Sequence, residues 1–147
     1  MTKAFIAGPL FDDAQRRMLE ELGAMVEALG IETFLPHRDA GLVEWGGSAP
    51  PTAEQIAAIF HKDRDALVGA DLVVAWVEGA DHDSGTCVEI GMAYARGIPV
   101  FALRTDRRPF VNPMVTGVCD EGRALYRSVP ALQRGLEAFL AGRTARR

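Results

Sequence analysis

An uninterrupted apolar run at residues 72–77, Leu-Val-Val-Ala-Trp-Val, is the feature that most constrains the fold. Its length fits one β-strand and is far below the roughly 20 residues of a membrane-spanning helix. A strand that is apolar on both faces is typical of a parallel sheet covered by helices on both sides, because a half-exposed strand alternates apolar with polar residues. The run therefore predicts a central strand of an α/β fold.

Short apolar segments alternate with helical patterns along the rest of the chain. Further strands are predicted over residues 3–7, 31–35, 98–103 and 124–126, and helices over residues 12–29, 52–69, 85–96 and 130–140, with a helical turn near Met114. Right-handed crossovers between these five strands give a doubly wound, flavodoxin-like parallel sheet in the order 2-1-3-4-5, with helices on both faces. Residues 36–51 show no sustained period and are expected to form a long, irregular loop.

The length of 147 residues leaves little room for a second domain. We expect a single domain over residues 1–142, followed by a basic tail over residues 143–147.

Composition and charge narrow the classes of function. The chain carries 16 Lys and Arg against 20 Asp and Glu, a net charge of −4 without a basic stripe, which disfavours nucleic acid as a partner. The sequence has neither a span long enough for a membrane nor a signal-peptide pattern, which predicts a cytoplasmic protein. Cys87 and Cys119 lack C-x-x-C spacing, and His37, His61 and His82 are scattered, so we expect no metal and no cofactor.

Two loops are expected at the crevice where the strand order reverses, residues 8–11 and 78–86, because open parallel sheets bind ligands beyond the carboxyl ends of their strands. Glu89 lies just after the second, acidic loop and has two interpretations. With Thr86 it fits a capping box, which is a structural role. Alternatively, a carboxylate in the first turn of a helix can act as a nucleophile or stabilise positive charge.

Four segments resemble the nucleoside 2-deoxyribosyltransferase family. They are Phe-Ile-Ala-Gly-Pro-Leu-Phe at 5–11, Leu-Pro-His-Arg-Asp at 35–39, Asp-Ser-Gly-Thr-Cys-Val-Glu-Ile-Gly-Met-Ala at 83–93, and Asn-Pro-Met at 112–114. The third segment, Asp-x-Gly-x-x-x-Glu-x-Gly-x-Ala between a strand and a helix, is the most specific. The resemblance implies an enzyme that moves 2-deoxyribose between nucleobases by cleaving an N-glycosidic bond through a covalent deoxyribosyl-glutamate intermediate.

The resemblance also implies roles for single residues. Glu89 is similar to the nucleophile that attacks C1′, and Asp63 to a carboxyl group that assists departure of the base. Asp83 is similar to the carboxylate that holds the sugar hydroxyl. Asn112 is similar to an asparagine that the family supplies from a neighbouring subunit to the 5′-hydroxyl, which implies a homo-oligomer. The substrate-binding residues expected on this basis, for a nucleoside and a free nucleobase, are Gly8, Pro9, Phe11, Asp83, Gly85, Asn112 and Met114.

One position departs from the family pattern. Phe5 stands where the family often has a tyrosine whose hydroxyl orients the catalytic carboxylate. This difference bears on the rate and on the placement of Glu89. A further aromatic residue, Trp45, is a candidate for stacking on a base or for partial burial against the core.

Three alternatives stay open. A related branch, the 2′-deoxynucleoside 5′-phosphate N-hydrolases, has serines where this chain has Asp83 and Asn112, and an aspartate there repels a phosphate dianion, which favours a nucleoside donor. Four arginines in loops nevertheless leave a phosphate-bearing donor open: Arg38, Arg104, Arg107 and Arg108. Water in place of an acceptor base would make the enzyme an N-glycosidase. A non-catalytic nucleotide-binding module is the third alternative, because many functions share this architecture.

Overall fold

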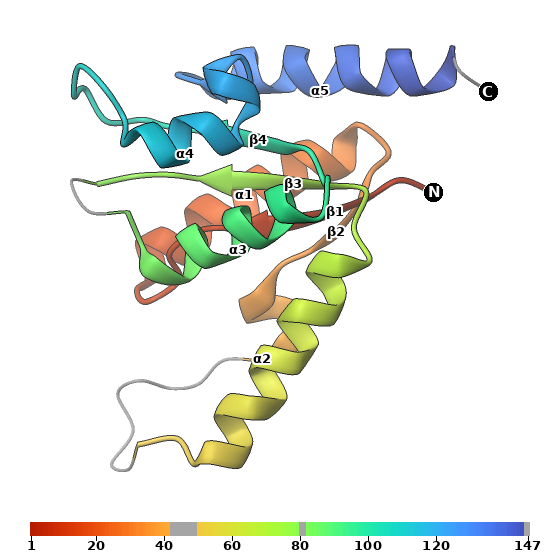
Figure 1. Cartoon of the computed structure of the whole chain (residues 1–147). Helices are drawn as coiled ribbons and strands as arrows, with labels where there is room; N and C mark the ends of the chain where they lie inside the picture. Colours follow the sequence, from red (N-terminus) through yellow and green to blue (C-terminus); the bar gives the residue numbers. More distant parts are fainter. Residues whose placement is uncertain (42–49, 80–81, 146–147) are drawn as a thin grey trace.

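The computed structural model describes residues 1–41, 50–79 and 82–145, which form a parallel sheet with helices on both faces (Figure 1). The strands are β1 (Lys3–Ala7), β2 (Glu32–Phe34), β3 (Leu72–Trp76), β4 (Val100–Leu103) and β5 (Leu125–Tyr126). The five strands lie in the order β2-β1-β3-β4-β5, all parallel, which confirms the predicted topology. The order reverses between β1 and β3, so the ligand crevice of this architecture lies at their carboxyl ends.

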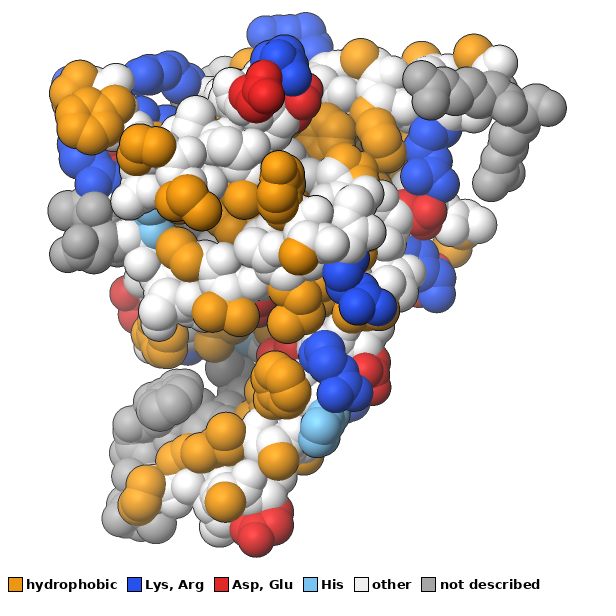
Figure 2. All heavy atoms as spheres, in the orientation of Figure 1, with side chains coloured by type: hydrophobic (Ala, Val, Ile, Leu, Met, Phe, Trp, Pro, Cys, Tyr) orange, Lys and Arg blue, Asp and Glu red, His pale blue; other side chains and the backbone are white. Residues whose placement is uncertain are grey.

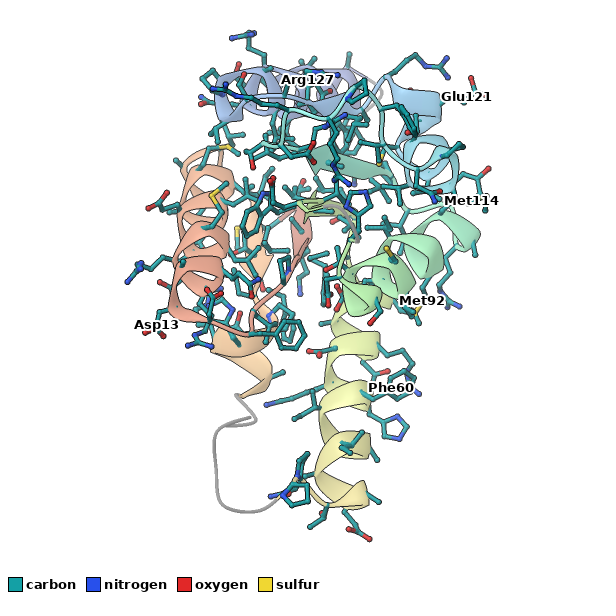
Figure 3. The ribbon with its side chains drawn as sticks, turned by 90° about the vertical axis from the view of Figure 1, so that its left-hand side faces the viewer. Asp13, Phe60, Met92, Met114, Glu121 and Arg127 are labelled. Carbon is teal, nitrogen blue, oxygen red and sulfur yellow. The ribbon has the colours of Figure 1, made fainter. Side chains whose placement is uncertain are left out.

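Two layers of helices cover the sheet. α1 (Asp13–Ala28) and α5 (Val129–Thr144) pack on one face, whereas α2 (Ala53–Val68), α3 (Ser84–Ala95) and α4 (Pro113–Val118) lie on the other (Figures 1 and 3). Two short segments complete the described part of the chain, the π-helix η1 (Pro36–Ala40) and the 3-10 helix η2 (Asp120–Gly122). None of the described helices combines the length and the hydrophobicity needed to cross a bilayer.

The core lies between the two layers and is centred on β1 and β3. The side chains without solvent exposure include Phe5, Ile6, Leu72, Val73 and Val74. The prediction of a central strand buried on both faces is therefore confirmed. Each such side chain contributes roughly 1.5–3 kcal/mol when it is removed from water, so the two strands that frame the crevice are the most firmly held part of the sheet.

The segment after β2 differs from the irregular loop that the sequence suggested, because η1 forms there. Asp39 accepts a hydrogen bond from the backbone N–H of Leu35 (2.9 Å), and the guanidinium of Arg38 pairs with Asp39 (3.0 Å) and Glu27 (3.0 Å). These side-chain contacts hold a turn that periodicity does not reveal.

α2 also differs from expectation, because its apolar face is mostly not buried. The helical spacing of Ile56, Ile59, Phe60 and Leu67 predicts one apolar face on this helix. Leu67 is 1% exposed, whereas Ile56 and Phe60 are 53% and 51% exposed. Figure 1 shows the reason: the N-terminal half of α2 extends past the sheet, so only its last turns pack on the core.

The chain end was expected to be a tail from residue 143, but α5 continues to Thr144. The guanidinium of Arg143 forms an ion pair with Asp71 (2.7 Å), which precedes β3. Residue 143 therefore belongs to the last turn of the helix.

Candidate active site

A cavity of about 250 Å³ lies at the carboxyl ends of β1 and β3. It brings together segments far apart in the sequence: the loop after β1, η1, α2 and the start of α3. Six of the residues predicted for the site line it, namely Gly8, Phe11, Asp63, Asp83, Gly85 and Glu89. The chain passes close to α1 here, since a Cβ atom on Gly8 would lie 2.5 Å from Cδ2 of the buried Leu19.

Three predicted residues are not among the described residues that line the cavity. Pro9 is buried. Asn112 is the N-cap of α4, where its Oδ1 accepts a hydrogen bond from the backbone N–H of Met114 (2.9 Å). The Met114 side chain is 77% exposed on the outer surface. Within one chain, therefore, the 112–114 segment lies outside the cavity.

The start of α3 bears on both interpretations of Glu89. Asp83 is the N-cap, and its Oδ2 accepts hydrogen bonds from both the backbone N–H and the hydroxyl of Thr86, each at 2.7 Å. The helix begins at Ser84, so Glu89 lies in the second turn rather than at the third position after a cap at Thr86. The capping-box interpretation is wrong, because Asp83 performs the capping instead. The expected position of Glu89 in the first turn is wrong for the same reason, so a reactive role for this carboxylate does not rest on the helix terminus.

Two carboxyl groups of the cavity have raised pKa values. Burial raises the pKa of Glu89 to about 8, and the negative charges of Asp63 and Asp83 add to the rise. Burial raises the pKa of Asp63 to about 6, although the nearby Lys62 charge acts in the opposite direction. Oδ1 of Asp63 is buried and has no hydrogen-bond partner in the described part of the chain. The cavity thus holds carboxyl groups that exchange protons near neutral pH, which suits acid–base and nucleophilic chemistry.

The remaining lining residues were not predicted for the site, and most are apolar. They include Leu10, Pro36, His37, Ile56 and Ile59. The two isoleucines belong to the apolar face that the helical spacing predicts, but the spacing does not show that this face lines a cavity. His37 lies in the family-like segment 35–39, and its position in the cavity wall depends on η1, which the sequence did not predict.

The arginines considered for phosphate binding are largely engaged elsewhere. Arg38 pairs with Asp39 and Glu27, and both the buried Arg104 and Arg108 pair with Asp106. None of these arginines, nor the exposed Arg107, is among the described residues of the cavity wall.

Three further observations concern the site. Phe5 is fully buried and stacks on Phe34 with 5.6 Å between ring centroids. Since phenylalanine has no hydroxyl, β1 offers none at this position.

Trp45 falls outside the described residues. Within residues 1–41, 50–79 and 82–145, no three His, Cys, Asp or Glu side chains are grouped as a bound metal ion would require.

The sequence pattern that defines the nucleoside 2-deoxyribosyltransferase family matches residues 4–132. The chain belongs to this family. No curated protein is a significant match. Several solved structures are similar to this member of the family.

A conserved protein from Enterococcus faecalis V583 has 28% identity and a TM-score of 0.78, with 94% of this chain and 98% of that chain covered. The 2-deoxyribosyltransferase from Bacillus psychrosaccharolyticus has 22% identity and a TM-score of 0.75, with 90% of each chain covered. A CMP N-glycosidase from Clostridium botulinum has 20% identity and a TM-score of 0.58, with 94% and 99% covered. The last two share the fold with this family member.

The raised pKa of Glu89 predicts a pH dependence of stability. The folded protein keeps a proton that the unfolded chain loses above the ordinary value of 4.5, so the stabilisation is complete below that pH and is lost as the pH rises through about 8. Glu89→Gln, which mimics the protonated form, should therefore raise the unfolding free energy at pH 9 by on the order of 2 kcal/mol and have little effect at pH 5.

Thermal unfolding between pH 5 and pH 9 measures this difference. Glu137→Gln, on the exposed face of α5, is the matched control and should show no such trend. An equal effect of Glu89→Gln at both pH values would contradict the burial of this carboxyl group.

Proposed function

We propose that this protein transfers 2-deoxyribose from a 2′-deoxynucleoside to a free nucleobase, with Glu89 as the nucleophile. The observation that carries the proposal is the convergence of Glu89, Asp63 and Asp83 on one cavity, in a chain whose family is named for this activity. Carboxyl groups are sufficient for the chemistry, and we propose no metal or cofactor.

The proposed reaction has two displacements at C1′. In the first, the ionised carboxylate of Glu89 forms an ester bond to C1′ while the C1′–N bond breaks, and the electron pair leaves with the base. The protonated Asp63 donates its proton to the departing base nitrogen. In the second, the nitrogen of an acceptor base attacks C1′, the ester bond breaks, and Asp63 takes up the released proton. A transition state with oxocarbenium character is stabilised by the nearby carboxylates, as in retaining glycosidases.

The pKa values support a shared proton between Asp63 and Glu89. Near pH 7 the pair holds one proton, because the two pKa values are about 6 and about 8. The reactive form has this proton on Asp63 and the charge on Glu89, which is the less populated of the two one-proton arrangements. Asp83, fixed by Thr86, would hold the sugar hydroxyl beside them.

We also propose that a second copy of the chain completes the site. The outer face of α2, α3 and α4 exposes large apolar side chains, among them Phe60 at 51%, Val88 at 60% and Met114 at 77%. Figure 2 shows hydrophobic side chains gathered over these helices, and in Figure 3 Phe60, Met92 and Met114 lie along the same side of the molecule. Exposed apolar surface of this kind is typical of a protein interface.

A second cavity supports the same assembly. It measures about 300 Å³, lies between α2 and α3, and is lined by Phe60, Val88 and Met92 together with Asp63 and Glu89. The carboxyl groups are therefore open to this face, and a second copy there would exclude water from them. In a symmetric pair, each copy would supply its Asn112 to the other's substrate.

Loss of the nucleophile tests the proposed reaction. When the protein is incubated with a 2′-deoxynucleoside and a different free base, chromatography should show a new deoxynucleoside. Glu89→Ala should lower its rate of formation by about 10³-fold or more without loss of the fold, while Glu137→Ala should retain activity. Near-normal turnover in folded Glu89→Ala would overturn the proposal, and release of free base without a new deoxynucleoside would make water the acceptor.

The shared proton predicts a bell-shaped pH profile of kcat/KM with limbs at about 6 and about 8. Asp63→Asn removes the group that must be protonated, so the fall at high pH should disappear while the rise from low pH remains. Initial rates of base release measure both profiles. Asp65→Asn, on the exposed side of the same helix, should keep the bell, and a bell in Asp63→Asn would exclude Asp63 as the acid.

Mixing two inactive variants tests the shared site. Asn112→Ala and Glu89→Ala should each be weakly active alone, since each lacks one half of every site. A mixed dimer contains one intact site, so equal mixing with subunit exchange should restore about a quarter of the wild-type activity. No recovery, with exchange verified by mass spectrometry, would show that Asn112 does not act across subunits.

A further inference from the structure

His37 stands out in the cavity wall because one of its ring nitrogens lacks a partner. Its side chain is 4% exposed, and Nδ1 is buried without a hydrogen-bond partner in the described part of the chain. A buried polar atom without a partner is unfavourable, because the hydration that it lost is not replaced by a hydrogen bond. Oδ1 of Asp63, which lines the same cavity, is in the same condition. Both atoms belong to residues that line one cavity, so a polar ligand there can pair with them once the side chains turn toward it.

The other ring nitrogen of His37 is held by Glu20. Nε2 lies 3.2 Å from Oε1 of Glu20, which extends from α1 and is 58% exposed in its side chain. An ionised carboxylate only accepts hydrogen bonds, so Nε2 carries the hydrogen. In the neutral imidazole, Nδ1 then has a lone pair and acts as an acceptor.

η1, which carries His37, is joined to α2, which carries Asp63. Nζ of Lys62 donates a hydrogen bond to the backbone carbonyl of Asp39 (3.1 Å), which joins η1 to the helix that carries Asp63. Asp83 and Glu89 come from α3 instead. Since Asp63 is proposed to protonate the departing base, we take the wall formed by η1 and α2, with His37 and Asp63, as the part of the cavity that receives the base.

The cavity wall offers few other polar groups to a base. Among the described lining residues, the ionisable side chains are the three carboxyl groups and His37, and the others are glycine, proline or apolar. Discrimination between bases by hydrogen bonds from the described side chains therefore depends on Asp63 and His37.

We propose that Nδ1 of His37 accepts a hydrogen bond from the exocyclic amino group of the base, so that His37 selects 6-aminopurines or 4-aminopyrimidines over their oxo counterparts. This inference rests on the proposed function, because it takes the ligand of the cavity to be a nucleobase. The ring turns toward the base about its Cβ–Cγ bond, a torsion with a broad energy well, and the exposed Glu20 follows Nε2. An oxo base directs a carbonyl lone pair at the same atom and leaves it unsatisfied.

Calorimetric titration of free bases tests the proposal without turnover. At about pH 8, adenine should bind the wild-type protein about tenfold more tightly than hypoxanthine, or cytosine than uracil. His37→Phe keeps the ring shape without nitrogen and should reduce the ratio to within about twofold. His37→Gln offers an amide that both donates and accepts, so it should bind both members of the pair. His61→Phe, on the exposed side of α2, is the matched control and should retain the wild-type ratio.

The rates of base release from the matching 2′-deoxynucleosides complete the experiment. Their kcat/KM ratio should change with the binding ratio in each variant, a readout that a purely structural role for His37 would not move. A wild-type ratio near one, or an unchanged ratio in both His37 variants, would overturn the role of His37. If the bases still bind and are still released in that case, the proposed function stands. Absence of both binding and release for all these compounds would overturn the proposed function and this inference together.

Discussion

The pairing of β1 with β3 is the constraint on which the candidate site depends. Ala7 pairs with Ala75 in the parallel register, and both residues are fully buried, so the two strands reach the same edge of the sheet nearly together. The loops that follow them leave from neighbouring points, although more than 60 residues separate them in sequence. Asp83 then fixes where α3 begins, because its Oδ2 binds both polar groups of Thr86. One strand pair and one helix cap thus set the position of Glu89.

The cavity disfavours the ionised forms of its carboxyl groups. Three carboxyl groups share a small space, and two of them lose enough water that their pKa values rise. A carboxylate in such surroundings is a stronger base and a better stabiliser of a developing cation than one in water, because fewer solvent dipoles compete for it. The burial of the flanking strands stabilises the fold enough to offset the unfavourable burial of these carboxyl groups.

The sheet was predictable from the sequence because its strands are continuous apolar runs, such as residues 72–77, and because crossover handedness leaves few possible orders. The start of α3 was not, since Asp83 and Thr86 are both good caps and only the backbone geometry selects one. The buried position of His37 was not predictable for a similar reason. It depends on η1, which contacts of Arg38 and Asp39 with Glu27 and Leu35 hold in place. The apolar face of α2 was predictable, but what it faces was not, because periodicity does not show how far a helix extends beyond a sheet.

The projection of α2 past the sheet has an evolutionary consequence. Ile56 lines the cavity yet contributes little to the core, since half of its surface is exposed. Substitutions at such positions are nearly neutral for folding, because they create no void against the strands. Ile56, near the exposed start of α2, therefore shapes the cavity without supporting the core, whereas Glu89 follows the buried strand β3. Mutation at such a position can change the shape of the cavity while the buried strands keep the sheet unchanged.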